Sequence, residues 1–360
     1  MISFQRAENS DHRSWNDFIK AAPNGNFRQT TYWGEIKSLT GWAPHYFLTK
    51  RDNEICGGAL IQERKIPLGH TSLLYCPNGP VVDWKDEEAC KTLLGGIKSF
   101  AKEKKSILMR SDPEPVAEEQ DQERHLAEAG FKKIPDRFSQ WNRTLYTTRV
   151  ILDLDEDQLF MRMRRTHRQN INTVRRSGVI TSYEIKAGDS SAFGVLMQGL
   201  EVRRHSVLHA QKYHEKVYEN LVLSGTGYFI KAELGDQVIS GLIVVILGDK
   251  AWAVFMANDY NYRKLMPNKL LLWEAIRLAK SLGCRFIDLG ASQGTGDFDP
   301  ENDPLDLLKS AYRPEVIYYP AYFDFHNSLL YPFFRIAERT VLPVSLKYYV
   351  KIIKRIEFCF

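Results

Sequence analysis

The chain has 360 residues, of which 44% are hydrophobic and 26% are charged, and its net charge at pH 7 is +5. This length suits two domains or one large domain, and the composition excludes long disorder and low-complexity architecture. The charge is too small to indicate a nucleic-acid partner by itself. The five cysteines are odd in number and widely spaced, which argues against a disulfide framework. The sequence has neither a CxxC nor an HExxH motif, which argues against a local zinc motif.

The N-terminal residues show no basic region followed by an apolar run, and no stretch reaches about 18 uncharged apolar residues. We therefore expect neither a signal peptide nor a membrane span. With reduced thiols, this predicts a cytoplasmic protein.

The first half of the chain predicts strands and helices in alternation. Its expected elements are a helical patch at 33–37, paired strands at 45–48 and 58–61, strands at 69–75 and 81–82, a helix over 86–104, a strand at 106–110 and a helix over 118–129. The helix over 118–129 is expected to end at Gly130.

The second half predicts a similar order of elements. They are a strand at 149–154, a basic helix over 156–177, helices near 190–204 and 211–224, antiparallel strands at 228–234, 238–247 and 251–256, a helix over 268–282, a strand at 286–289 and a polar loop over 290–304. The sequence thus predicts two related α/β (α+β) lobes with mixed, largely antiparallel sheets flanked by helices. We place them at 1–148 and 149–322, followed by a helical segment at 323–360.

Six short segments in this order carry a family likeness. They are Leu74–Asp83, Arg110–Pro113, Arg175–Val179, Tyr262–Asn268, Phe286–Gly290 and Leu307–Glu315. In this order and spacing the chain resembles the FemABX aminoacyltransferases over roughly residues 25–325. It lacks the long helical-hairpin arm that some members insert in the second lobe.

The resemblance implies two GNAT-like lobes and a specific reaction. An amino acid would pass from aminoacyl-tRNA to an amine of a peptidoglycan precursor peptide on a nucleotide-linked or lipid-linked carrier. It implies no cofactor and no metal, and we expect a monomer.

Lys309 and Asp112 are the catalytic residues that the resemblance implies. Lys309 matches the family's functional lysine, and a fixed ammonium would stabilise the oxyanion that forms when an amine attacks an ester. A solvated surface lysine is the alternative. Asp112 matches a candidate base, for which we prefer an orienting role. An Asx turn before Pro113 is the alternative there.

The resemblance also implies residues that bind the acceptor. Lys37 matches a basic position used on precursor phosphate, although it could equally be a solvated lysine. His209 and Tyr213 fall where the family has an Arg and a Tyr on one helix face. A neutral histidine binds phosphate less well than arginine. Phe255 is the fourth residue that we expect to bind the acceptor. No metal site is expected from the neighbouring histidines His205, His209 and His214.

The helix expected over 156–177 is rich in arginine. Arg164, Arg168 and Arg175 share one stripe, and with Arg313 they are candidates for contact with tRNA phosphate or an anionic lipid headgroup. A solvated basic face is the alternative. His167 lies on the opposite, apolar stripe, where we expect a buried histidine with satisfied hydrogen bonds.

The segment 328–360 is aromatic and basic. We expect it to pack back on the first lobe. The alternative is an interfacial helix that seats the protein peripherally on an anionic membrane.

Two other functions compete with aminoacyl transfer from tRNA. A GNAT-type N-acyltransferase using acyl-coenzyme A on a cell-envelope amine would need a glycine-rich pyrophosphate loop before the helix over 268–282. That turn has no glycine, and Pro267 lacks an N–H, which disfavours coenzyme A. The third hypothesis is a non-catalytic binding protein.

Overall fold

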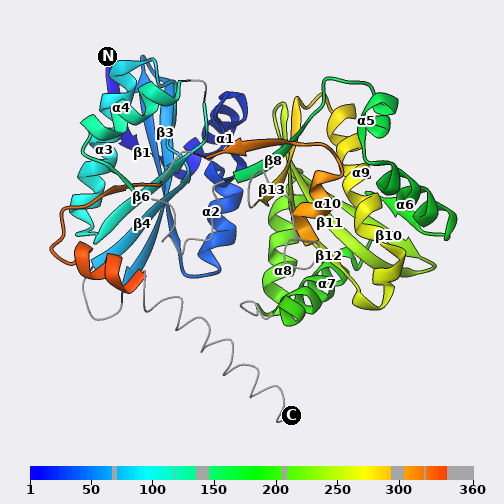
Figure 1. The fold of residues 1–360 in the computed structure, drawn as a ribbon. Coiled ribbons are helices and arrows are strands. Elements are labelled where there is room, and N and C mark those ends of the chain that lie inside the picture. The colour runs from blue at the N-terminus through cyan, green and yellow to red at the C-terminus, as the bar shows by residue number, and fades with distance from the viewer. Residues whose placement is uncertain are drawn as a thin grey trace, which may run out of the picture. The chain divides into compact units, whose positions relative to one another are not determined.

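The computed structural model describes residues 1–66, 71–116, 118–134, 146–204, 209–292, 304–319 and 322–338. The chain divides into two compact units, one formed by Met1–Arg143 with Tyr319–Phe360 and the other by Thr144–Tyr318. Each unit is a sheet with helices packed against it (Figure 1). The first unit therefore takes residues from both ends of the sequence. The boundaries expected at 148 and 322 lie a few residues from these divisions.

The sheet of the first unit has the strand order β1-β2-β3-β4-β6-β15-β7, with β5 paired to β3. Its strands are β1 (Ile2–Arg6), β2 (Ala43–Arg51), β3 (Glu54–Ile66), β4 (Thr71–Asn78), β5 (Val81–Val82), β6 (Leu108–Pro113), β7 (Lys132–Ile134) and β15 (Tyr322–Phe325). Its helices are α1 (His12–Ala21), α2 (Thr31–Ser38), α3 (Glu87–Glu103) and α4 (Glu119–Glu128), and residues 331–338 are also helical.

The sheet of the second unit has the strand order β14-β8-β13-β12-β11-β10-β9. Its strands are β8 (Tyr146–Ile151), β9 (Ile180–Ser182), β10 (Gly227–Leu234), β11 (Gln237–Leu247), β12 (Lys250–Asn258), β13 (Phe286–Ser292) and β14 (Glu315–Tyr318). Its helices are α5 (Glu156–Arg162), α6 (Arg165–Arg176), α7 (Asp189–Arg204), α8 (Gln211–Tyr218) with the π-helical η4 (Glu219–Leu223), η5 (Tyr260–Leu265), α9 (Pro267–Ser281) and α10 (Pro304–Ser310).

Both sheets follow one plan. Each contains one parallel pair joined by a crossover helix, β4 and β6 through α3 and β12 and β13 through α9. An antiparallel strand then flanks the crossover strand, β15 beside β6 and β8 beside β13. The α/β class with mixed, largely antiparallel sheets flanked by helices is confirmed.

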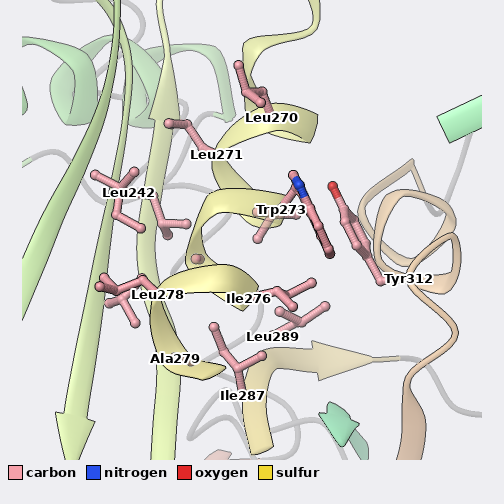
Figure 2. Packing of buried hydrophobic residues seen from close by; sticks show 14 of the residues in the cluster. Leu242, Leu270, Leu271, Trp273, Ile276, Leu278, Ala279, Ile287, Leu289 and Tyr312 are labelled. Atoms are coloured by element: carbon pink, nitrogen blue, oxygen red, sulfur yellow. The ribbon is translucent and has the colours of Figure 1, made fainter. Parts of the chain in front are cut away.

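Helix α9 forms the centre of the core of the second unit. Its start is favoured by Pro267 at the first helical position, and Gly283 follows its end with φ of 76°. Figure 2 shows its apolar side chains between Leu242 of β11 and Tyr312, which follows α10. The Tyr312 hydroxyl donates to the carbonyl of Lys269 at 2.6 Å. This contact fixes α10 against the start of α9.

The single basic helix predicted over 156–177 is two helices in the structure. Helices α5 and α6 are separated by Met163, whose backbone is extended, and Arg164. The Arg168 guanidinium donates to the carbonyls of Met161 and Met163, and so satisfies the end of α5. The apolar spacing continues across the break, so the sequence pattern does not reveal it.

Several further elements differ from the sequence prediction. Residues 322–325 form strand β15, where a helix was expected from residue 323, and all four are buried between β6 and β7. Lys309 lies on the short helix α10. Strand β1 and helix α1 were not predicted.

Among the described residues of the second unit, the longest helix is α7, with 16 residues, so this part of the chain has no long helical arm. None of the described helices has the length and apolar character needed to cross a membrane.

Candidate active site

In the second unit, β12 and β13 separate soon after they begin. Their parallel pairing extends only as far as Trp252 opposite Asp288. Beyond it, the pairing of β13 with β8 is irregular between Asp288 and Ala291, and Gly290 has φ of 86°. A residue with a side chain would be strained in that conformation. The Asp288 carboxylate accepts the Gly290 N–H at 2.8 Å and thereby stabilises the irregularity.

Lys309 points at this irregular backbone. Its Nζ donates to the Ala291 carbonyl at 2.6 Å, and the residue is only 4% exposed. Burial lowers the pKa of the ammonium; Asp306 and Asp288 act to raise it, and Arg204 lowers it. An ammonium has three donors, and in the described ranges no other hydrogen-bond partner of Nζ is found. Lys309 is therefore an oriented, buried cation rather than a solvated one.

A cavity of about 510 Å³ lies beside α10 within the second unit. It is lined by the start of α6, the end of α7, the end of β12, the start of α9, and α10 itself, including Leu308. Its lining residues in the described part of the chain include no acidic residue and four cationic ones, which are Arg164, Arg204, Arg263 and Lys269. Burial lowers the pKa of Lys269. The cavity therefore favours an anion such as phosphate.

His167 also lines this cavity. It is buried as expected, but the expectation of satisfied hydrogen bonds is wrong, because Nε2 has no partner among the described residues. Burial, with Lys269 and Arg164 nearby, lowers the pKa of His167 to about 4. Its ring packs edge-on against Tyr312, with ring centroids 5.2 Å apart. The imidazole is consequently uncharged at neutral pH.

Asp112 lies in the first unit, at the end of β6. Its carboxylate accepts the Asn78 N–H at 2.7 Å and the Tyr75 hydroxyl at 2.8 Å, and the residue is buried. Both oxygens are therefore engaged within the unit. This geometry suits a residue that orients its neighbours.

Lys37 of α2 lies with its Nζ 4.9 Å from the centre of the Trp33 ring. Burial, and to a smaller degree Arg28, lowers the pKa of Lys37 to about 8. A lysine with this pKa changes charge close to physiological pH.

Glu201, His209 and His214 could hold a metal, because their ligand atoms lie within 4.8 Å of one another. The Glu201 carboxylate already accepts a hydrogen bond from His209 Nδ1 at 2.8 Å and lies 3.2 Å from His214 Nε2. The His209 ring also stacks on Tyr213, with ring centroids 4.3 Å apart. The cluster is thus held together by its carboxylate, and His209 and Tyr213 lie side by side, as their spacing predicts. His205 lies outside the described residues.

The other sequence-predicted residues do not join the cavity. Arg175 pairs with Glu274 at 3.1 Å. Arg313 is exposed and has a φ of 53°. Phe255 of β12 packs near Phe193, with ring centroids 6.4 Å apart. Of the predicted phosphate contacts, Arg164 alone lines the cavity in the described ranges, since Arg168 caps α5.

The FemAB family model matches residues 11–221, more than half of the chain. The chain belongs to the FemAB family. A GNAT acetyltransferase domain model matches residues 161–299, which lie within the second unit. The predicted family and enzyme class are confirmed: this member of the FemAB family is an acyltransferase.

Similar proteins extend over nearly the whole chain. Lipid II:glycine glycyltransferase of Staphylococcus aureus is 22% identical over 413 residues, covering 94% of this chain and 96% of the relative. The crystal structure of FemX matches with a TM-score of 0.81 at 20% identity, covering 93% of this chain and all of that one. A further match is the C-terminal domain (DUF2156) of an Agrobacterium fabrum protein that is named a putative lysylphosphatidylglycerol synthetase. Its TM-score is 0.57 at 11% identity, covering 92% of this chain and 96% of that one. The structural matches support the fold.

Sequence reasoning missed Arg204, Arg263, Lys269 and His167 as lining residues. Arg204 ends α7 and Lys269 begins α9, so their approach depends on how distant helices pack.

Proposed function

We propose that this acyltransferase moves an amino acid from aminoacyl-tRNA to an amine of a peptidoglycan precursor peptide. The observation that carries the proposal is the buried ammonium of Lys309, on the helix α10 whose residues Leu307 and Leu308 line a cationic cavity in the GNAT-like unit. The FemAB family match and the name of the staphylococcal relative support the class of acceptor.

The reaction needs a cation where negative charge develops. The amine nitrogen attacks the ester carbonyl, a C–N bond forms, the C–O bond to the tRNA ribose breaks, and the proton that the amine loses passes to the departing ribose oxygen. Lys309 would donate to the oxyanion through N–H bonds that Ala291 does not use. The two engaged oxygens of Asp112 favour an orienting role for that residue.

The cavity suits the phosphates at the acceptor end of a tRNA. Arg164 and Arg204 would contact them through planar guanidinium groups, and Lys269 would contact them as a single positive charge. These contacts would not depend on the base sequence of the tRNA. Arg168, Arg175 and Arg313 would contribute at longer range. Binding of this kind falls steeply as salt rises.

The acceptor would be a muropeptide on a nucleotide or a lipid carrier. We propose Lys37 of the first unit as a contact for a precursor phosphate and, separately, His209, Tyr213 and Phe255 of the second unit as contacts for a peptide. The name of the staphylococcal relative, which contains lipid II, favours the lipid-linked form.

A GNAT-type acyltransferase that uses acyl-coenzyme A is the second candidate, favoured by the domain match at 161–299. The start of α9 argues against it. Met266 has φ of 55°, Pro267 lacks an N–H, and the Lys269 N–H already bonds the Met266 carbonyl at 3.0 Å. Few N–H groups are left there for a pyrophosphate.

Thermal unfolding with added ligands distinguishes these functions. A nucleotide-linked muropeptide and a non-hydrolysable aminoacyl-tRNA end should each raise the melting temperature, and coenzyme A should not. Stabilisation by coenzyme A alone would replace the proposal with the second candidate. Stabilisation by the muropeptide alone would favour a binding protein.

A further inference from the structure

The helical residues 331–338 turn charged side chains inward and apolar ones outward. Glu338 is 0% exposed and Arg335 is buried, whereas Phe333 is 69% exposed and Leu329, just before the helix, is 91% exposed. A helix that only packs on a protein core shows the opposite arrangement. We call the apolar side the outward face; its residues are Leu329, Leu330, Phe333 and Ile336.

A buried ionic network fixes this orientation. Arg110 of β6 donates to Asp324 of β15 at 2.7 and 2.8 Å and to Glu338 at 2.5 Å. Arg335 also donates to Glu338, and the Tyr331 hydroxyl donates to Asp324 at 3.1 Å. Rotating the helix to bury its apolar residues would leave buried charges without partners, at a large cost. The outward face is therefore imposed by the core of the first unit.

The sequence directly after this helix is basic. Residues 339–360 contain five Lys or Arg and one Glu, and five less one gives a net charge of +4. Apolar residues recur there at three- and four-residue spacing in Leu346, Tyr349, Val350 and Ile353, and basic residues recur likewise in Lys347, Lys351 and Lys354. This combination of apolar and basic side chains is typical of segments that bind anionic membranes.

We propose that the outward face docks on an anionic lipid surface. Leu329, Leu330 and Phe333 would enter the boundary between headgroups and acyl chains, where exposed apolar side chains leave water. The inference does not depend on the donor in the transfer reaction. It would bring the enzyme to the surface on which a lipid-linked acceptor resides.

Flotation of the full chain with vesicles tests this proposal. The protein should bind phosphatidylcholine vesicles that contain phosphatidylglycerol and bind pure phosphatidylcholine vesicles weakly. The double variant L330S/F333S should bind the anionic vesicles at least about tenfold more weakly. Its melting temperature should match the parent, because both side chains are exposed. A matched control, I180S/L223S, removes two exposed apolar side chains of the second unit and should bind like the parent.

A second variant tests the charge. Lys351→Ala with Lys354→Ala should weaken binding to anionic vesicles and flatten its salt dependence. Turnover of a soluble, nucleotide-linked precursor should be unchanged in L330S/F333S, so failure of the lipid proposal and failure of the transfer proposal are separable.

Three results would overturn the proposal. One is a parent chain that binds neither vesicle, and another is equal binding by L330S/F333S and the parent. The third is a concentration-dependent dimer that L330S/F333S abolishes while vesicles have no effect, which would assign the face to a second copy of the chain.

Discussion

The ammonium of Lys309 lies 2.6 Å from the carbonyl oxygen of Ala291, at the point where β13 leaves regular pairing. Two contacts fix the helix that carries Lys309: the Tyr312 hydroxyl donates to the Lys269 carbonyl, and the Arg164 N–H donates to the Ala311 carbonyl at 3.0 Å. The cation is thus positioned by backbone on both sides before any substrate arrives. Such preorganisation is what a stabiliser of developing negative charge requires.

Replacing Lys309 with methionine should lower kcat by about 10²–10³-fold, the range found for loss of one oxyanion donor. The melting temperature should stay level or rise, because the change removes a buried charge. Steady-state kinetics and thermal unfolding measure the two effects. The control is Lys264→Met, at an exposed lysine in η5. Equal turnover in Lys309→Met and the parent would remove Lys309 from the site.

Lys37 should make precursor binding depend on pH. Because its pKa is lowered to about 8, the ammonium is lost as pH rises through 8, and affinity for the precursor phosphate should fall there. Its contribution to stability has the opposite sign: between pH 8 and 10.5 the unfolded chain holds more protons, so folding gains as pH rises. Titrations with nucleotide-linked precursor at pH 7 and 9 provide the measurement. The Lys37→Arg variant should bind the precursor with equal affinity at pH 7 and 9. If the parent also binds with equal affinity at both pH values, Lys37 does not contact the precursor phosphate.

Asp112→Asn should reduce the rate only moderately. The amide retains one acceptor for the Asn78 N–H or the Tyr75 hydroxyl, and we expect a loss of about 1–3 kcal/mol in the free energy of unfolding. An obligatory base would instead cost about 10²–10⁴-fold in rate. Tyr75→Phe is the matched control, since it removes one of these hydrogen bonds and leaves the carboxylate. A rate loss of the larger size in Asp112→Asn alone would show that the orienting role is wrong.

Lys269 should contribute to the salt dependence of tRNA binding. If it contacts one phosphate, Lys269→Met should reduce the slope of log affinity against log salt by about one. Arg175→Met should change the slope less, because Arg175 is already paired with Glu274. Filter binding at several salt concentrations measures both slopes. The reverse order of effects would place the phosphates on the exposed face of α6 rather than in the cavity.

Local sequence patterns predicted most helices and strands of both units, because apolar spacing and turn residues act within a few positions. Helix α9 is the clearest case, with its apolar faces, Pro267 and Gly283. Strand β15 was missed because its partners, β6 and β7, lie far earlier in the sequence. Spacing along the chain carries no information about such a pairing.

The candidate site was predictable in part for a similar reason. Lys309 and Asp112 were predicted from motifs, whereas the burial of His167 Nε2, which has no partner in the described part of the chain, follows from tertiary packing alone. Arg168 was predicted to contact phosphate because it lies on a basic stripe, but in the structure its guanidinium caps the end of α5.

Mass spectrometry of the acceptor tests the central claim most directly. The full chain is incubated with charged total tRNA and with nucleotide-linked or lipid-linked muropeptide, and parallel reactions contain RNase-treated tRNA or acyl-coenzyme A. We predict that the muropeptide gains the mass of one amino-acid residue, only with intact charged tRNA, and that Lys309→Met does not support this gain. A product that forms with acyl-coenzyme A and without tRNA would contradict the account, as would an unmodified muropeptide in every reaction.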